Sequence, residues 1–368
     1  MKRVVMQAVG STDPGTLLLT EHARLSAEDR VLVLSAGDPA LILNAGRRTA
    51  SVAVYDISYR AIQRAQEQVM ARLSDAPITF SDGVFPDAED GFDVALMAVP
   101  KGRDFARAQL WSALKALRPG GRLYIAGPTR GGAKSVLDDA AVLFGHSVTL
   151  NTKRRYRVGV AVRPERSEAL AYPTEWGADP TFVQRRVFET PRGPIPVATM
   201  PGIFSWERLD DGTAFLMEHV AFEPGQDVLD VGSGSGVLGI AAALSDHASG
   251  RVTLTDDNLL AVRCARASVA INALSNVSVQ PGDVYSGLGG QRFDLIISNP
   301  PFHKTFDVNT NVAHRIMREA KDHLRPGGRL VIVANAFLKY EDVMAAHLPK
   351  ARVLARNNRY IVIEGRRG

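Results

Sequence analysis

A seven-residue segment occurs twice in this chain of 368 residues, and this repeat constrains the fold more than any other feature. Leu117–Leu123 reads LRPGGRL, and the same letters recur at Leu324–Leu330. Three more pairs of similar segments lie upstream in one shared order: Phe92–Val94 with Phe293–Leu295, Val52–Asp56 with Val252–Asp256, and Val31–Gly37 with Val228–Gly234. Because the four pairs keep nearly one offset, they indicate two similar domains rather than a solenoid of short repeats.

Both halves have the pattern of strands that alternate with helices. Short apolar runs predict buried strands, and the longer alanine-rich or periodic stretches between them predict helices. In the second half we expect strands at Asp227–Val231, Val252–Thr255, Phe293–Ser298 and Leu330–Ala334, and helices at Val237–Ser245, Leu259–Ala273 and Ala313–Leu324. The first half predicts matching strands at Val31–Leu34, Val52–Tyr55, Val94–Ala98 and Leu123–Ala126. This order predicts an α/β protein of two tandem, doubly wound, Rossmann-like domains, each a parallel sheet covered on both faces.

The segment between the halves has a different composition. We place a first domain at residues 1–165, a connecting segment at 166–198 and a second domain at 199–368. Within the connecting segment, Phe182–Val187 and Pro196–Ala198 can pair as strands around a Pro- and Gly-containing turn. A basic cluster, Lys153–Arg157, comes shortly before the first boundary.

Composition excludes several classes of protein. The chain contains one cysteine, Cys264, so it has neither a disulfide framework nor a Cys-rich zinc site, and we expect no metal. No apolar run is long enough to cross a membrane, and the N-terminus lacks the apolar stretch of a signal peptide, so we expect a cytoplasmic protein. The net charge of +5 permits binding to a polyanion without requiring it.

A glycine-rich loop follows the first expected strand of the second half. Asp230–Gly236 reads DVGSGSG and comes directly before an expected helix, so its backbone can approach a ligand closely at a helix N-terminus. A tight turn without a ligand is the alternative. A dinucleotide-binding fingerprint would need its third glycine at Val237, and the lysine of a P-loop is missing. The loop instead resembles motif I of class I S-adenosylmethionine (SAM) methyltransferases.

Two acidic residues follow the next strands. By the same resemblance, Asp256 stands at the strand end where such enzymes hold the ribose hydroxyls, and a carboxylate accepts two such hydrogen bonds well. Asp283 would follow the third strand and could reach the adenine amino group. A strand-end cap for Asp256 and an exposed turn for Asp283 are the alternatives.

The segment Ser298–Phe302 reads SNPPF and follows an expected buried strand. Two prolines there end the strand ladder and stiffen the turn. The motif resembles the Asn-Pro-Pro-Phe/Tyr signature of SAM methyltransferases that act on an exocyclic or amide nitrogen. The Asn299 side-chain carbonyl and the Pro300 backbone carbonyl can both accept from an NH₂ group, and Phe302 offers a stacking face. Proximity and alignment then account for catalysis without a strong base.

Taken together, the two halves resemble the RsmC/RlmG family of ribosomal RNA guanine-N2 methyltransferases. Members join a degenerate N-terminal methyltransferase domain to an active one. The segments Pro201–Ser205 and Leu209–Thr213 resemble the family's wall of the cofactor and target pocket, which adds Phe204 and Thr213 as candidates. The resemblance implies catalytic roles for Asn299, Pro300 and Phe302, and cofactor contacts at Asp230, Gly232, Ser233, Gly234, Gly236, Asp256, Asp283, Phe204 and Thr213. A lead-in to a helix with an Asp/Thr cap explains the Leu209–Thr213 segment equally well.

The same resemblance implies SAM as cofactor and guanosine in ribosomal RNA as substrate, with N2-methylguanosine as product. Val333–Leu338 resembles the members that modify the small subunit, whereas Asp307–Ala313 resembles those that modify the large subunit. We favour 16S rRNA, with the 30S subunit as partner, and keep 23S rRNA as the alternative. We expect a monomer.

The first half lacks the chemical groups of the second. Aligning the halves pairs Asp230 with Val33, Gly232 with Ser35, Gly236 with Pro39 and Asn299 with Ala98. We therefore expect the first half to bind no SAM and to act as a brace or as an RNA-binding surface. In the second case Arg154 and Arg155 would contact phosphates, because guanidinium groups suit them.

Three other functions remain open from the residues alone. Methylation of a protein glutamine is one, because enzymes with Asn-Pro-Pro-Tyr perform it, and methylation of DNA adenine is another. A non-catalytic RNA-binding or assembly factor could also keep a SAM fold. The presence of Asp230, Gly232, Gly234, Gly236 and Asn299 together favours an enzyme.

Overall fold

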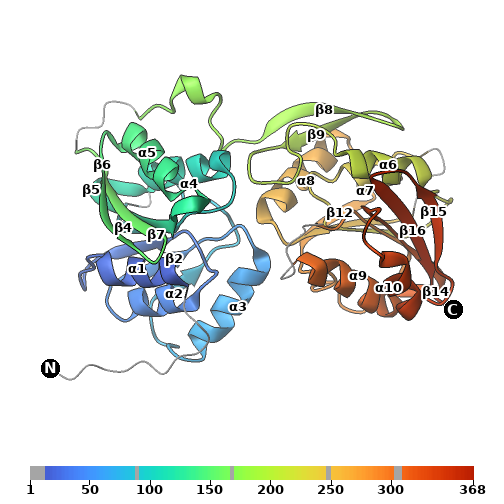
Figure 1. Cartoon of the computed structure of the whole chain (residues 1–368), viewed down its shortest axis with the longest axis horizontal. Helices are drawn as coiled ribbons and strands as arrows, with labels where there is room; N and C mark the ends of the chain where they lie inside the picture. The colour runs from blue at the N-terminus through green and yellow to red at the C-terminus, as the bar shows by residue number, and fades with distance from the viewer. Residues whose placement is uncertain (1–12, 88–90, 166–169, 246–249, 302–308) are drawn as a thin grey trace. The chain divides into compact units, whose positions relative to one another are not determined.

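A computed structural model of the whole chain describes residues 13–87, 91–165, 170–245, 250–301 and 309–368, the side chains of 309–311 excepted. Contacts divide the chain into two compact units, unit 1 at Met1–Phe182 and unit 2 at Val183–Gly368. Figure 1 colours unit 1 from blue to green and unit 2 from yellow-green to red. Each unit is described by itself.

Unit 1 contains a seven-stranded sheet in the order β3-β2-β1-β4-β5-β7-β6. The first five strands in this order, from β3 to β5, are parallel to one another. Strand β7 is antiparallel to both of its neighbours, β5 and β6. The strands are β1 (Arg30–Val33), β2 (Ser51–Val54), β3 (Ile78–Phe80), β4 (Phe92–Ala98), β5 (Leu117–Pro128), β6 (Ser147–Lys153) and β7 (Tyr156–Val162). The helices are α1 (Pro14–His22), α2 (Pro39–Gly46), α3 (Tyr59–Met70), α4 (Arg103–Ala116) and α5 (Ala133–Phe144). Short 3-10 turns lie at Thr129–Gly131 and Thr174–Trp176.

Unit 2 repeats this strand order as β12-β11-β10-β13-β14-β16-β15 and adds a two-stranded hairpin. The hairpin is β8 (Gln184–Thr190) and β9 (Gly193–Thr199). The sheet strands are β10 (Val228–Val231), β11 (Val252–Asp256), β12 (Val277–Pro281), β13 (Phe293–Ser298), β14 (Leu324–Asn335), β15 (Arg352–Arg356) and β16 (Tyr360–Arg366). The helices are α6 (Asp211–His219), α7 (Val237–Ala243), α8 (Leu259–Ile271), α9 (Asn309–His323) and α10 (Tyr340–His347).

The sheets differ from the expectation in being mixed. The last two strands of each unit form an antiparallel hairpin at one edge, because a parallel strand would need a long crossover connection. The repeated heptapeptide also lies inside a strand in both units, whereas we expected a helix up to Leu324. Helix α9 ends at His323, and Gly327 takes a positive φ of 76° where the register between β13 and β14 shifts. The proline and the two glycines of this heptapeptide thus form an irregular first part of β14.

Burial explains why the central strands are so apolar. All four residues of β10 are buried, as parallel strands covered on both faces require. One core cluster of unit 2 lies against α6, α7 and α8, and a second lies against α9 and α10. The β8–β9 hairpin contributes Phe188, Ile195 and Val197 to the first cluster, so it packs as part of unit 2. The predicted pairing of these two strands is confirmed, although the first strand begins later and ends later than predicted and the second is longer at both ends.

Parallel order brings the carboxyl ends of β10, β11 and β13 to one edge of the sheet of unit 2. In doubly wound folds, ligands bind outside these strand ends, where the strand order reverses. Among the described residues, no helix is both long enough and apolar enough to pass through a membrane.

Candidate active site

The glycine-rich loop between β10 and α7 depends on glycine for its backbone shape. Gly232, Gly234 and Gly236 have φ angles of 73°, 57° and 85°, a region that other L-residues rarely adopt. The backbone N–H groups of Gly232 and Ser233 both donate to the Thr255 carbonyl, at 2.8 and 3.0 Å. These bonds hold the loop against the end of β11 and leave the N-terminus of α7 beside it.

Ser233 supplies a polar atom that fits a ligand. Its hydroxyl oxygen is buried and has no hydrogen-bond partner among the residues that the structure describes. A buried polar atom without a partner is costly, so a bound molecule that pairs with it would relieve that cost. This observation favours a ligand at the loop over a bare tight turn.

Asp230 connects the loop to α7. Its side chain is buried and accepts a hydrogen bond of 2.9 Å from the backbone N–H of Gly239. Burial raises the pKa of Asp230 to about 7, and the nearby Asp256 carboxylate adds to the rise. A Cβ atom at Gly239 would lie 2.1 Å from Leu254 Cδ2, so glycine there allows the helix to approach the sheet. Asp230 therefore joins the end of β10 to α7.

Asp256 ends β11 and holds the loop from the other side. Its carboxylate accepts from the backbone N–H of Gly234 and from that of Asn258, each at 2.8 Å. Burial raises the pKa of Asp256 to about 6. Asn258 caps α8 and donates to the Gly202 carbonyl at 2.8 Å, which ties in the segment before α6.

Unit 1 retains the hydrogen bonds of this acid without the glycine loop. Asp56 accepts from the backbone N–H groups of Ala36, at 2.6 Å, and Ser58, at 2.8 Å. Gly37 has no positive φ, and Pro39 begins α2. Both units therefore use an acid after the second strand to hold the backbone of the loop after the first strand. Asp256 differs from Asp56 in that the loop it holds contains three glycines at positive φ.

Asn299 lies directly after β13, and its orientation is fixed by two residues of the α6 region. Its amide nitrogen donates to Asp210 Oδ2 at 2.9 Å and to Thr213 Oγ1 at 2.8 Å. Asp210 caps α6 by accepting from the Thr213 backbone N–H at 2.9 Å. Because both contacts use the amide nitrogen, the Asn299 carbonyl oxygen remains as the acceptor that the side chain offers to the pocket.

Sequence reasoning missed the contact of Asp210 with Asn299. The only available signal was its position as a helix cap, three residues before Thr213. The two residues that it joins lie 89 positions apart in the chain, and the fold alone brings them together.

A pocket of about 380 Å³ unites most of the predicted residues. Asp283 does not line it, because its carboxylate pairs with Arg315 of α9 at 2.8 Å. Gly236 does not line it either: a Cβ there would lie 3.1 Å from Leu254, so this glycine serves the packing of α7. The sequence-predicted residues that line the pocket are Phe204, Thr213, Asp230, Gly232, Ser233, Gly234, Asp256, Asn299 and Pro300.

Phe302 and the following His303 lie outside the described residues, as does the start of the segment Asp307–Ala313. Phe204 is 67% exposed and is an aromatic side chain at the pocket. In the part of the chain that the structure describes, no group of three or more His, Cys, Asp or Glu side chains could hold a metal ion.

Comparison with known families decides between the alternatives left open by the sequence. The family model described as the methyltransferase small domain matches residues 4–159 and 194–364. The chain belongs to this family. Its membership confirms the methyltransferase fold, the family expected from the sequence and SAM-dependent methyl transfer as the activity.

Relatives of this family member are similar over most of its length. Ribosomal RNA small subunit methyltransferase C from Pseudomonas entomophila is 34% identical over 76% of this chain and 81% of the relative. The protein of the same name from Sodalis glossinidius is 31% identical over 95% of this chain and 94% of the relative. The solved T. thermophilus 16S rRNA N2 methyltransferase RsmC, in complex with AdoMet and guanosine, has a TM-score of 0.80 and 26% identity, covering 98% of this chain and 93% of that one.

Proposed function

We propose that this enzyme transfers the methyl group of SAM to the exocyclic N2 amine of a guanine in small-subunit ribosomal RNA. The products are N2-methylguanosine, S-adenosylhomocysteine and a proton, which the methylated nitrogen releases to solvent. The names of the relatives and the guanosine in the T. thermophilus complex support this substrate. The observation that carries the proposal is the Asn299 amide, whose nitrogen is held by Asp210 and Thr213 while its carbonyl oxygen is left for an amino group.

The glycine loop fits the cofactor. When bound, SAM supplies an electrophilic methyl group on its sulfonium. Gly232 and Gly234 let the backbone approach it, and Ser233 offers its unpaired hydroxyl. Asp256 would hold the ribose by accepting from its hydroxyls in addition to its backbone donors. Asp283 pairs with Arg315 and does not line the pocket, so the structure gives no support to an adenine contact by this residue.

Asn299 and Pro300 act on the amine. Their carbonyl oxygens accept its two N–H bonds, which turns the nitrogen lone pair away from both. Positive charge develops on the nitrogen as the new bond forms, and the two carbonyl dipoles stabilise it. Asp210 strengthens this effect through Asn299, since a carboxylate that accepts from the amide nitrogen makes the amide oxygen a better acceptor.

Aromatic side chains would hold the base in this scheme. Phe204 is exposed at the pocket, and Phe302 follows Pro301 directly in the chain. Bases of RNA that are not paired stack on such rings. The proposed substrate places the protein in the cytoplasm, with the 30S subunit or its RNA as partner. Modification of 23S rRNA is the second candidate.

Transfer of tritiated methyl groups to separate substrates tests the proposal. The full-length protein is incubated with SAM and with 30S subunits, 50S subunits, rRNA free of protein, or ribosomal protein. We expect label in 16S rRNA and, after digestion, in N2-methylguanosine. Label in 23S rRNA alone supports the second candidate, and label only in protein or at another atom contradicts the proposal.

A further inference from the structure

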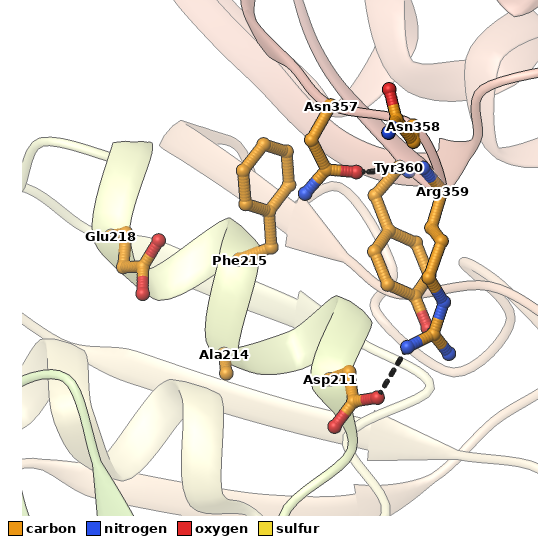
Figure 2. Close-up of a pocket in the computed structure, with 8 residues that line it drawn as sticks. All are labelled: Asp211, Ala214, Phe215, Glu218, Asn357, Asn358, Arg359 and Tyr360. Atoms are coloured by element: carbon orange, nitrogen blue, oxygen red, sulfur yellow. Dashed lines mark hydrogen bonds and ion pairs between the residues drawn. The ribbon is translucent and has the colours of Figure 1, made fainter.

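A second hollow of about 570 Å³ adjoins the candidate active site in unit 2. It lies between α6 and the turn that joins β15 to β16, and Figure 2 shows the side chains of both elements facing it. Tyr360 lines this hollow and the active-site pocket alike. The hollow therefore shares a wall residue with the pocket where we position the target base, and we call it the flanking hollow.

The flanking hollow combines aromatic faces with side-chain amides. The rings of Phe215 and Tyr360 have centroids 6.3 Å apart. The Asn357 side-chain oxygen accepts from the backbone N–H groups of Arg359 and Tyr360, at 2.8 and 2.7 Å. Figure 2 shows that its amide nitrogen consequently points toward Phe215, where it can donate to a ligand. Rings for stacking beside amide donors match an unpaired nucleic-acid base.

The charges of the flanking hollow favour a base over a phosphate. Two carboxylates, Asp211 and Glu218, line it together with a single guanidinium, that of Arg359. Arg359 pairs with Asp211 at 2.8 Å and lies over the Tyr360 ring at 5.0 Å. A groove that follows an RNA backbone carries excess positive charge, whereas this lining carries excess negative charge. Carboxylates do accept from the exocyclic amino groups of bases.

We propose that the flanking hollow binds the base of a nucleotide adjacent to the methylated guanine. The inference rests on the proposed function and adds a second recognition site to it. A guanine can present its N2 to Asn299 only when it is unstacked from its neighbours, so an adjacent base must find another surface. The rings of Phe215 and Tyr360, next to the active-site pocket, provide that surface.

A double-mutant cycle between protein and RNA tests this contact. The variant is Phe215→Leu, which keeps an apolar side chain without the ring. The substrates are the unmethylated rRNA fragment that contains the target guanine and two versions with an abasic nucleotide, one on each side of that guanine. We expect Phe215→Leu to raise the KM for intact RNA about five- to a hundredfold, the range for loss of one stacked base. On one abasic RNA the variant and the wild type should then differ less than threefold.

Controls separate folding and the wider function from this contact. Arg251→Ala removes an exposed side chain near the opposite edge of the sheet, and its KM should equal that of the wild type. The Kd for SAM should be unchanged in every variant, which shows that each one is folded. Absence of guanine methylation by the wild type contradicts the proposed function itself. An unchanged KM for Phe215→Leu, or an equal effect of this variant on intact RNA and both abasic RNAs, overturns the proposed base contact at the flanking hollow and leaves the proposed function standing.

Discussion

The side-chain amide of Asn299 has an NH₂ group that donates hydrogen bonds and a carbonyl oxygen that accepts them, and the NH₂ group is bound within the protein. Asp210 and Thr213 hold the amide nitrogen, so the carbonyl oxygen is presented in one orientation. Without these two partners the amide could rotate by half a turn and present NH₂ to an amine, which would repel it. Catalysis in this account depends on that choice between two rotamers.

Replacing Thr213 tests the orientation of Asn299. Thr213→Val removes one acceptor at nearly constant volume and leaves the backbone cap by Asp210 in place. We expect kcat to fall about three- to tenfold, the usual worth of one hydrogen bond, with the Kd for SAM unchanged. Thr213→Ser keeps the hydroxyl and should retain most of the wild-type kcat. If Thr213→Val instead weakens SAM binding at normal kcat, Thr213 is a cofactor contact.

The raised pKa of Asp256 makes SAM binding dependent on pH. Burial raises this pKa to about 6, and accepting from ribose hydroxyls requires the ionised carboxylate. Below pH 6 the protein must release a proton to bind, so the affinity should fall about tenfold for each further pH unit. Calorimetry between pH 4.5 and 8 would measure this slope. Asp256→Asn should bind SAM more weakly, and its affinity should no longer depend on pH in this range. If the pH dependence persists in this variant, the proton released on binding comes from another group, such as Asp230.

At the scale of elements, short local motifs were predictable and long-range contacts were not. The glycine-rich loop at Asp230–Gly236 can be recognised from the sequence because all of its residues are consecutive. Asp283 stands in a plausible turn, but the fold places Arg315 beside it. The proline and glycines of the repeated heptapeptide predict the end of a helix. In the structure the heptapeptide begins β14, and the register shift there involves β13, which the heptapeptide alone does not reveal.

The β6–β7 turn of unit 1 carries the arginines expected to contact RNA. Arg154 and Arg155 form this turn with φ angles of 51° and 65°, and the Arg155 carbonyl accepts from Thr129 at 2.8 Å. Both side chains are exposed at the tip of the hairpin. The turn thus holds two adjacent guanidinium groups on a backbone fixed by the sheet.

Removing this charge tests whether unit 1 contacts RNA. Arg154→Ala together with Arg155→Ala should raise the KM for RNA and lower its log–log salt slope by roughly 1.4 to 1.8 if both arginines contact phosphates. The Kd for SAM should not change. Arg47→Ala with Arg48→Ala removes equal charge from another exposed site of unit 1 and serves as the control. An unchanged KM and salt slope would make unit 1 a structural brace.

At the scale of the whole molecule, two units of one topology differ in chemistry. Both keep the acid at the end of the second strand and its backbone hydrogen bonds. Only in unit 2 does that acid face a loop with three glycines at positive φ. The repeat in the sequence predicted the shared framework, which the two strand orders confirm. The pairing of Asn299 with Ala98 predicts that unit 2 is the catalytic half.

This asymmetry predicts one SAM site per chain. Calorimetry should give a stoichiometry of one. Asp256→Ala should weaken binding about ten- to a hundredfold, through loss of charged hydrogen bonds, whereas the matched Asp56→Ala should leave the Kd unchanged. A stoichiometry of two, or equal effects of the two variants, would show that unit 1 binds the cofactor.

The rate of methyl transfer by Asn299→Ala, measured in a single turnover with SAM already bound, tests the central claim most directly. If the Asn299 carbonyl orients the guanine amine, the rate should fall about a hundredfold or more while the Kd for SAM stays within a factor of two. A rate close to that of the wild type would contradict this account of catalysis.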